Sequence, residues 1–531
     1  MKKRLLALSM AMIMVAGTLT ACTTTEEPAT GTEATEAPAE GGEEATEAPA
    51  EGGEEATEAP AVEDAATMEA PSTDGWDESM KIYVYSWNDE LGNRLTNIIG
   101  DTDAAGNDLN GPDTTVTGTH PEYADYVEYI NLGESGTDAK YKTDIQNAVD
   151  DGSKYPSLIP ADNDVAKFFM ESDYVMPVTD AGITTDMYAN AYKYTVDYAT
   201  VDGDLMAVTW QATPGCLIYR TDIAEEVLGT SDPAEVQEAV KDWDSFFATA
   251  DLMKEAGYAM TSGPDEAKYA LWDQQTQPWI TVSADGSETL TLDEAVKNEL
   301  ETAKKLYDGG YVTADDALMW SNAWNANYRG NVFCYFGCTW SVYWCMNTDI
   351  QSEEDYQKAL DAETDAAKKK EMEEKRAIEL ANPDSTYGKW HICQGPVAYH
   401  WGGTYVCIGA DTPNPELCGY LLYELCCDKD VMYEISARTS DFVNNKASME
   451  KISAEGKGTS EKLGGQDVVA VWLEAAPKIN LSNATYLDAD IKGFADEARK
   501  AYIAGTYTDA DQAVDFVKEQ VKKKFSNVTV E

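Results

Sequence analysis

A low-complexity segment near the N-terminus limits where folding can begin. The sequence EATEAPAEGG occurs at residues 33–42 and again at 44–53, and a third, partial copy follows from Glu55. Between Thr23 and Gly75 there are 16 acidic residues and no basic one. The repeat has no large apolar side chain, so it cannot bury enough surface to offset the entropy of the chain. We therefore expect residues 22–75 to be a disordered acidic tether, spanning roughly 40 Å as a coil.

The chain begins with the features of a secretory leader. Three basic residues follow Met1, and an apolar run, residues 5–15, is too short to span a bilayer. We expect residues 1–21 to be a signal peptide. The sequence LTAC, which ends at Cys22, resembles the lipobox of bacterial lipoproteins. That resemblance implies cleavage before Cys22 and lipidation of its sulfur by diacylglycerol, with palmitate, which would hold the protein on the extracytoplasmic face of the cell membrane.

The charge of the chain excludes several classes of partner. The formal net charge is −57 at pH 7, and most of it lies beyond the tether. A strongly acidic surface argues against nucleic acid and against anionic lipid. No later apolar run is long enough to cross a membrane. We expect an exported body that meets the membrane through its lipid anchor only.

The remainder of the chain, residues 76–531, predicts a mixed α/β protein. Its length exceeds that of a single hydrophobic core, so two lobes are expected. Thr291 and Glu294 form a capping box for one helix. A charged stretch, residues 351–380, predicts surface helices. The clearest elements are strands at 81–87 and 157–162 and helices at 291–310 and 508–525.

Cysteine and histidine usage gives no sign of a metal or cofactor. Nine cysteines follow Cys22, an odd number that cannot all pair internally, and we expect them to be small buried side chains with free thiols. The three histidines, His120, His391 and His400, are too few and too scattered to suggest a catalytic triad. His391 and His400 are expected to fill the core or surface. We predict no metal and no cofactor.

Aromatic residues are the abundant chemical feature. The chain has 13 Trp and 30 Tyr. Five tryptophans stand beside polar side chains at the ends of strand-like segments: Trp87, Trp210, Trp272, Trp340 and Trp401. Any one of them could be a core residue whose indole N–H needs a partner. Together they indicate a wet cleft, because a sugar needs flat apolar faces for its C–H groups and amides or carboxylates for its hydroxyls.

Several motifs occur together in a recognisable order. The chain resembles the carbohydrate-binding family of extracellular solute-binding proteins, which supply ABC importers. The motifs that carry the resemblance lie at residues 82–95, 155–169, 209–220, 334–340 and 401–410. The resemblance implies an α/β, two-lobed, periplasmic-binding-protein-like fold with a hinge and an interlobe ligand cleft. No cofactor is implied.

The resemblance also implies how the chain visits the two lobes. The first lobe would comprise residues 76–208 and 405–440, and the second lobe residues 209–404 and 441–531. The chain would cross between the lobes at Thr209–Cys216 and again near Trp401–Cys407. Pro214 and Gly215 would end one strand and permit the first bend.

Site residues follow from the same resemblance. Trp210 is expected on the floor of the cleft, with packing under the hinge as the alternative. Trp320 and Trp324 are expected in the core, at positions i and i+4 of a predicted helix. The residues expected to bind ligand are Trp87, Asn88, Glu90, Asp162, Asp164, Trp210, Gln211, Trp272, Trp340, Trp401, Gly402, Gly403, Tyr486 and Asp488.

The expected function is binding without chemistry. We predict a monomeric protein, not an enzyme, that captures a sugar or oligosaccharide and delivers it to the permease subunits of an ABC transporter. One alternative is a tethered glycoside hydrolase, which would need tryptophan platforms and two carboxylates about 5–9.5 Å apart. Another is a binding protein for peptides or other solutes.

Overall fold

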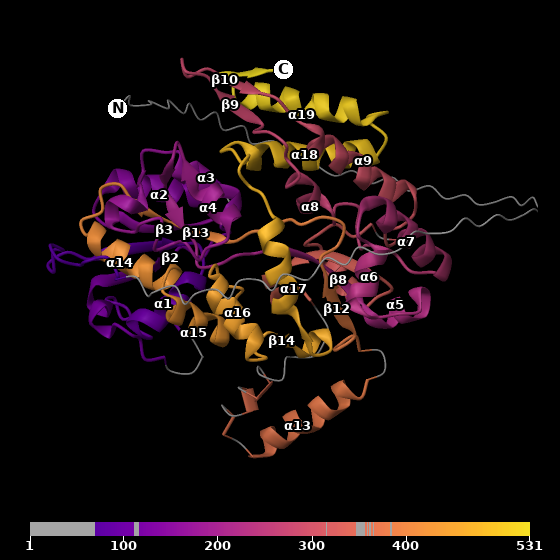
Figure 1. Cartoon of the computed structure of the whole chain (residues 1–531), viewed down its shortest axis with the longest axis horizontal. Coiled ribbons are helices and arrows are strands. Elements are labelled where there is room, and N and C mark those ends of the chain that lie inside the picture. Colours follow the sequence, from indigo (N-terminus) through magenta and orange to yellow (C-terminus); the bar gives the residue numbers. More distant parts are fainter. Residues whose placement is uncertain are drawn as a thin grey trace, which may run out of the picture. The chain divides into compact units, whose positions relative to one another are not determined.

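The computed structural model describes residues 69–110, 116–137, 139–314, 316–346, 356–357, 359–360, 363–364, 366–382 and 385–531. The chain forms two units, residues 1–65 and 66–531, and every described element belongs to the second (Figure 1). The predicted signal peptide, the lipidation site at Cys22 and most of the tether lie outside the described residues. The tether was expected to reach residue 75, but Pro71 is buried, and Ala70 packs against the core.

The first sheet is built mainly from N-terminal strands. Its order is β2 (Val127–Asn131), β1 (Ile82–Ser86), β3 (Pro156–Asp162), β13 (Thr404–Gly409) and β4 (Val175–Met176), and β7 (Ala207–Val208) also pairs with β13. β1 is parallel to β2 and β3, whereas β13 is antiparallel to β3. β1 alternates as predicted, with Ile82, Val84 and Ser86 buried and the tyrosines between them partly exposed.

Helices cover both faces of this sheet (Figure 1). One face carries α1 (Glu90–Ile99) and α14 (Pro415–Cys426). On the same side, α15 (Lys429–Thr439) packs against these two helices. The other face carries α2 (Ala139–Asp151) and α3 (Asn163–Met170), with α4 (Lys193–Ala199) beside α3. We call these elements the first lobe.

The second sheet is antiparallel and centred on β8 (Gly215–Arg220), between β11 (Cys334–Cys338) and β12 (Trp390–Cys393). All six residues of β8 are buried, which suits a central strand packed on both faces. The helices around it are α5 (Thr221–Leu228), α6 (Pro233–Ala239), α7 (Trp243–Ala256), α11 (Thr339–Trp344) and α17 (Val468–Ala475).

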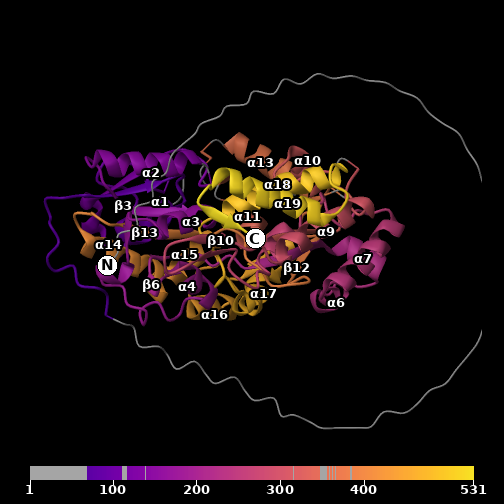
Figure 2. The ribbon, with the colours of Figure 1, turned by 90° about the horizontal axis from the view of Figure 1, so that it is seen from above.

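A third sheet has a separate small core. Strands β16 (Val528–Val530), β10 (Glu288–Leu290) and β9 (Ile280–Val282) lie beside α9 (Glu294–Asp308), α18 (Asp488–Ile503) and α19 (Ala510–Lys524). α18 and α19 run side by side (Figure 2). α8 (Lys268–Trp272) packs against α9. The elements of the second and third sheets form the second lobe.

Two predicted helices are present, with one correction. α19 lies within the predicted 508–525, and α9 lies within the predicted 291–310. The capping box of Thr291 and Glu294 is wrong, because Asp293 is the N-cap of α9 and its carboxylate accepts a hydrogen bond from Ala295 N at 3.1 Å. Asp293 competes well for this role because a short carboxylate is a strong N-cap.

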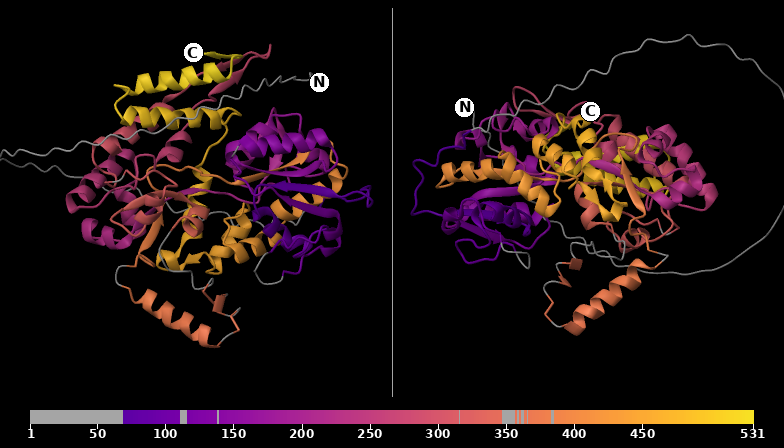
Figure 3. Two further views of the ribbon diagram at one scale, coloured as in Figure 1. Left: turned by 180° about the vertical axis from the view of Figure 1, so that it is seen from behind. Right: turned by 60° about the horizontal axis from the view of Figure 1, so that its bottom comes forward.

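The remaining helices include α10 (Asn322–Asn327), α16 (Lys446–Ala454) and α13 (Ala366–Leu380). α13 lies in the predicted charged stretch, and only Arg376 is buried along it. Figure 3 shows α13 at the margin of the described structure in two views. All nine cysteines after Cys22 are buried and free, as predicted.

Candidate ligand-binding site

The two lobes are joined by strand-to-strand connections. Residues 209–214 lead from β7 in the first sheet to β8 in the second, and residues 394–403 lead from β12 back to β13. A third segment, residues 441–445, runs beside the first, where Ala212 N donates to Phe442 O at 3.0 Å. Groups that face ligand from either lobe should therefore lie near these connections.

Trp210 lies inside the first connection and not on its surface. Its side chain is fully buried, and Nε1 donates to the carboxylate of Asp441 at 3.2 Å. The same carboxylate accepts two hydrogen bonds from the guanidinium of Arg94, each 2.8 Å long. The prediction that Trp210 lies on the cleft floor is wrong. The alternative holds, because the indole packs under the hinge, where it joins two connections to α1.

Gln211 continues this network toward the first sheet. Its amide nitrogen donates to Glu90 Oε1 at 2.6 Å, and its amide oxygen accepts from Thr404 N at 3.2 Å. Burial raises the pKa of Glu90, and the nearby charge of Arg94 opposes that rise. Gln211 is buried, so its side chain is used to hold α1 against β13.

Carboxylates mark the end of the central strand of the first sheet. Asp162 ends β3 and caps α3, where its side chain accepts from Asp164 N at 2.9 Å. Burial raises the pKa of Asp162 to about 8, and the charge of Asp164 adds to that shift. Both side chains are half-buried, at the edge of the sheet that faces the second lobe.

Four aromatic rings form a continuous patch in the second lobe, which we call the aromatic patch: Tyr269, Trp401, Trp340 and Trp320. Tyr269 stacks on Trp401 with ring centroids 4.7 Å apart, and Trp401 meets Trp340 edge-on at 4.8 Å. Trp340 stacks on Trp320 at 5.9 Å with the planes 8° apart. The two predicted tryptophans in this patch, Trp340 and Trp401, are therefore brought together.

Tyr269 and Trp320 are the residues of this patch that the sequence did not predict, and Trp320 was placed elsewhere. It was expected in the core, but its side chain is 55% exposed, whereas Trp324 is buried as expected. Trp320 lies outside the helix, because Ser321 is the N-cap and accepts from Trp324 N at 3.1 Å. The sequence holds a signal for this placement, because a serine at position 321 favours the start of a helix after Trp320. The backbone of Trp320 has φ of +69°, which costs a bulky residue energy and is typical of functional sites.

Two glycines bring the second connection close to these groups. Gly402 has φ of +73°, and a Cβ atom there would lie 3.1 Å from Trp340 Nε1. Gly403 has φ of +98°, and its carbonyl accepts from Asn163 N at 2.9 Å. A side chain at either position would strain the backbone, and it would crowd Trp340 at Gly402 and Thr213 at Gly403.

The carboxylates of the first lobe and the aromatic patch lie beside each other. Burial raises the pKa of Tyr269, and the negative charges of Asp164 and Asp162 act in the same direction. The pairing of Asp162 with Thr404 and the Asn163–Gly403 hydrogen bond place Asp162 and Asp164 near Trp401 and the Tyr269 ring stacked on it. The arrangement presents flat apolar faces and hydrogen-bonding groups side by side.

Two predicted tryptophans do not join this group. Trp87 is 8% exposed and packs edge-on against Tyr141 in the first lobe, at 5.6 Å. Trp272 is 3% exposed and belongs to the core around the third sheet. Their expected exposure to ligand is wrong, because a tryptophan beside polar residues can equally be a core residue.

The remaining predicted residues lie around the margins. Asn88 is exposed, and its side chain accepts from Glu90 N at 3.0 Å. Tyr486 is half-buried and donates to Glu288 at 3.0 Å. Asp488 is buried and accepts from Gln275 at 3.1 Å, between the lobes.

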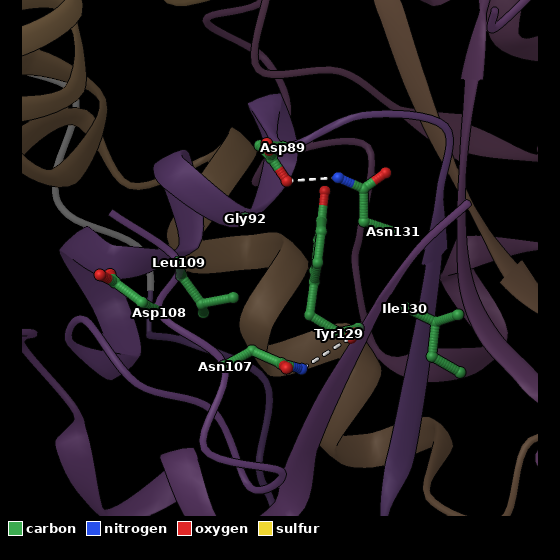
Figure 4. A pocket seen from close by; sticks show the side chains of 8 residues that line it. All are labelled: Asp89, Gly92, Asn107, Asp108, Leu109, Tyr129, Ile130 and Asn131. Atoms are coloured by element: carbon green, nitrogen blue, oxygen red, sulfur yellow. Dashed lines mark hydrogen bonds between the residues drawn. The ribbon is translucent and has the colours of Figure 1, made fainter. Parts of the chain in front are cut away.

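A cavity of about 440 Å³ lies within the first lobe (Figure 4). It sits where β1 and β2 end, with Tyr129 at its centre, and Asn131 donates to Asp89 across it. The lining residues are Asp89, Gly92, Asn107, Asp108, Leu109, Tyr129, Ile130 and Asn131. All of them come from one lobe, so this cavity is not the interlobe site.

Two searches of the described residues gave no site of another kind. In that part of the chain, no three His, Cys, Asp or Glu side chains gather as a metal site would require. Within the same ranges, no helix combines the length and apolar character needed to cross a membrane.

Comparison with known families identifies the chain. Residues 125–462 match the family described as bacterial extracellular solute-binding protein. The chain belongs to this family. A search of curated proteins finds no match to this solute-binding protein.

Several solved structures of binding proteins share this fold. One, described as extracellular solute-binding protein family 1, has a TM-score of 0.63 at 14% identity, covering 84% of this chain and 99% of that one. The galacto-N-biose/lacto-N-biose I-binding protein of Bifidobacterium longum has a TM-score of 0.57 at 14% identity, covering 86% and 100%. The binding protein from B. animalis subsp. lactis Bl-04, in complex with β-1,6-galactobiose, has a TM-score of 0.54 at 18% identity, covering 85% and 99%.

These comparisons confirm the predicted family and the two-lobed α/β fold. They also decide between a binding protein and a glycoside hydrolase. Members of the matched family are binding proteins and not enzymes, so this solute-binding protein is not a glycoside hydrolase.

The raised pKa of Asp162 predicts how the stability of this solute-binding protein depends on pH. An aspartate has a pKa of about 3.9 in an unfolded chain, so between about pH 4 and 8 only the folded state holds this proton. Stability should therefore fall as pH rises through that window. In Asp162→Asn the fall should be shallower, by up to about 1.4 kcal/mol per pH unit. Denaturant unfolding of both proteins at several pH values measures this, and equal slopes would contradict it.

Proposed function

We propose that this protein captures a sugar or oligosaccharide between its two lobes and delivers it to the permease of an ABC transporter. The observation that carries the proposal is the aromatic patch lying beside Asp162 and Asp164. Indole faces suit the C–H surfaces of a sugar ring, and carboxyl groups suit its hydroxyls. Two proteins of the same fold were solved with β-1,6-galactobiose and lacto-N-biose bound, which supports a sugar for this chain.

Within this proposal the binding residues are partly those predicted. Asp162, Asp164, Trp340, Gly402 and Gly403 remain and Trp320 is added, whereas Trp401, which is 5% exposed, supports the rings of Trp340 and Tyr269. Trp210 and Gln211 act instead by holding the connections between the lobes. We propose that the lobes, residues 76–208 with 405–440 and residues 209–404 with 441–531, close around the sugar by bending these connections.

Trp320 offers the sharpest test of the aromatic patch. Trp320→Ala should weaken sugar binding by about 1–3 kcal/mol, which is roughly ten- to a hundredfold, because a flat contact is lost. Its stability should change little, since the side chain is 55% exposed. Titration calorimetry with the sugar measures the affinity.

A matched control uses a tryptophan that lies before β1. Trp76 packs against Tyr123 and Tyr126, at the opposite end of the first sheet from Asp162. Trp76→Ala should therefore bind sugar as the wild type does. If Trp320→Ala also binds normally, the aromatic patch does not bind the sugar.

We also propose that Cys22 carries the lipid that attaches the protein to the cell membrane. The LTAC sequence and the long acidic segment after it support this. Cys22→Ser should remain as unprocessed precursor or appear in the medium, because the thiol that accepts the lipid is gone. Fractionation of cells shows which, and wild-type processing with membrane attachment would contradict the proposal.

A thermal-shift panel tests the function as a whole. The probes are glucose, galactose, maltose, lacto-N-biose, β-1,6-galactobiose and a mixture of short peptides. A sugar that binds only the folded state raises the melting temperature. A rise with peptides alone would favour a peptide-binding protein, and release of new reducing ends would contradict the proposal.

A further inference from the structure

A small cavity lies where the two lobes touch, apart from the aromatic patch. Its volume is about 20 Å³, enough for a group the size of one water molecule. The first lobe contributes Asn163, at the start of α3, and the connection back to the first sheet contributes His400. The second lobe contributes Asp273 and Asp488. A sugar ring is too large to enter, one hydroxyl group fits the cavity as it stands, and two fit only when the lobes lie slightly further apart.

Two buried polar atoms at this cavity have nothing to bond to. Asn163 is 8% exposed and His400 is 4% exposed. Within the ranges that the structure describes, neither Asn163 Oδ1 nor His400 Nε2 has a hydrogen-bond partner. Buried polar atoms are almost always paired in proteins, and leaving them unpaired costs free energy. Both residues line the same cavity, which points to a bound group that completes these two atoms.

The bonding of His400 decides which kind of group is needed. Asp273 Oδ2 accepts from His400 N at 2.7 Å and from His400 Nδ1 at 2.5 Å. Because a carboxylate can only accept, Nδ1 carries the proton, so Nε2 is an acceptor in the neutral form of the ring. Asn163 Oδ1 is also an acceptor. Both atoms therefore require hydrogen-bond donors.

The neighbouring side chains do not supply these donors. Lys167 Nζ donates to Thr200 O at 3.4 Å, and Lys492 Nζ lies over the ring of Trp272 at 5.8 Å. The other charged groups at the cavity, Asp164, Asp273 and Asp488, are carboxyl groups. The backbone of Asn163 is fixed from both sides, since its N–H donates to Gly403 and its carbonyl accepts from Tyr198 Oη at 2.5 Å.

We propose that Asn163 and His400 bind adjacent hydroxyl groups of the sugar, each accepting one hydrogen bond as the lobes meet. This proposal rests on the proposed function and adds to it that the ligand presents two neighbouring free hydroxyls. Because the two residues come from the first lobe and from the connection between the lobes, they would be completed together only when the sugar is enclosed.

The test uses the sugar from the thermal-shift panel that raises the melting temperature most. His400→Phe and Asn163→Leu should each bind it roughly tenfold more weakly or worse, because an acceptor is lost. Without sugar, Asn163→Leu should melt no lower than the wild type, since an unpaired buried atom has been removed. His400→Phe should melt lower, because the Asp273 carboxylate also loses its bond from Nδ1, so Asn163→Leu is the variant that separates the roles. A purely structural role predicts a lower melting temperature and unchanged affinity for Asn163→Leu.

Two further variants make the result decisive. His391→Phe is the matched control, because His391 lies on β12 beside Tyr219, and it should bind normally. His400→Gln keeps a neutral acceptor near Nε2, so it should bind better than His400→Phe. If His400→Gln folds but binds as weakly as His400→Phe, the acceptor role is wrong. If the sugar binds every variant as it binds the wild type, this inference fails alone, and if no sugar binds the wild type, the proposed function fails with it.

Discussion

Replacing Trp210 with alanine should lower the free energy of unfolding by about 3–5 kcal/mol. The side chain is completely buried under the first connection between the lobes, and its N–H is bonded to Asp441. Alanine would leave a large cavity and would remove one of the donors to that carboxylate. Denaturant unfolding of the mature protein measures the loss.

Two comparisons show whether the loss has this cause. Trp210→Phe keeps one aromatic ring and loses the N–H with the rest of the indole, so it leaves a smaller cavity and should cost less than the alanine variant. Trp320→Ala removes an exposed tryptophan and should change stability by less than about 1 kcal/mol. If Trp210→Ala unfolded like the wild type, then Trp210 would be a surface residue of the cleft after all.

Replacing Arg499 with methionine should also cost about 3–5 kcal/mol, because it would leave a buried carboxylate without its partner. Arg499 and Glu299 are each 1% exposed, and Arg499 donates to Glu299 at 2.6 Å, joining α18 to α9. Burial raises the pKa of Glu299, and the charge of Arg499 opposes that rise. Without the arginine, Glu299 would take up a proton more readily in the folded state, so the stability of the variant should fall further as pH increases.

The control for this pair is the double variant Arg499→Met with Glu299→Leu. Two apolar side chains of similar volume should restore most of the lost stability, because no charge remains buried. Denaturant unfolding of the single and double variants separates the cost of an unpaired charge from the cost of lost packing. A single variant as stable as the wild type would show that the ion pair contributes nothing.

Local patterns predicted the elements well and the ligand-facing tryptophans less well. β1 follows from alternation over a few residues, β3 from a short strand-like run that ends in an acidic residue, and α9 and α19 from helical periodicity, because each pattern lies within the element itself. A tryptophan beside a polar residue is ambiguous, since a buried indole also seeks a polar partner. Trp87 and Trp210 are of that kind.

Other features depend on contacts between distant parts of the chain. His400 was expected to be a filler, and its pairing with Asp273 brings together residues 127 positions apart. The Trp210–Asp441 bond spans 231 positions, and no local pattern indicates it. Trp320 could have been placed correctly, because Ser321 is a preferred N-cap residue and moves the tryptophan out of the helix.

The central claim is that a sugar is enclosed between the two lobes, and small-angle scattering tests it most directly. The mature protein is measured with and without the sugar that raises its melting temperature most, so that the tether contributes to both curves alike. Closure of the lobes around the sugar predicts a smaller radius of gyration at saturation. An unchanged radius, with binding established by calorimetry in the same sample, would contradict the enclosure of the sugar.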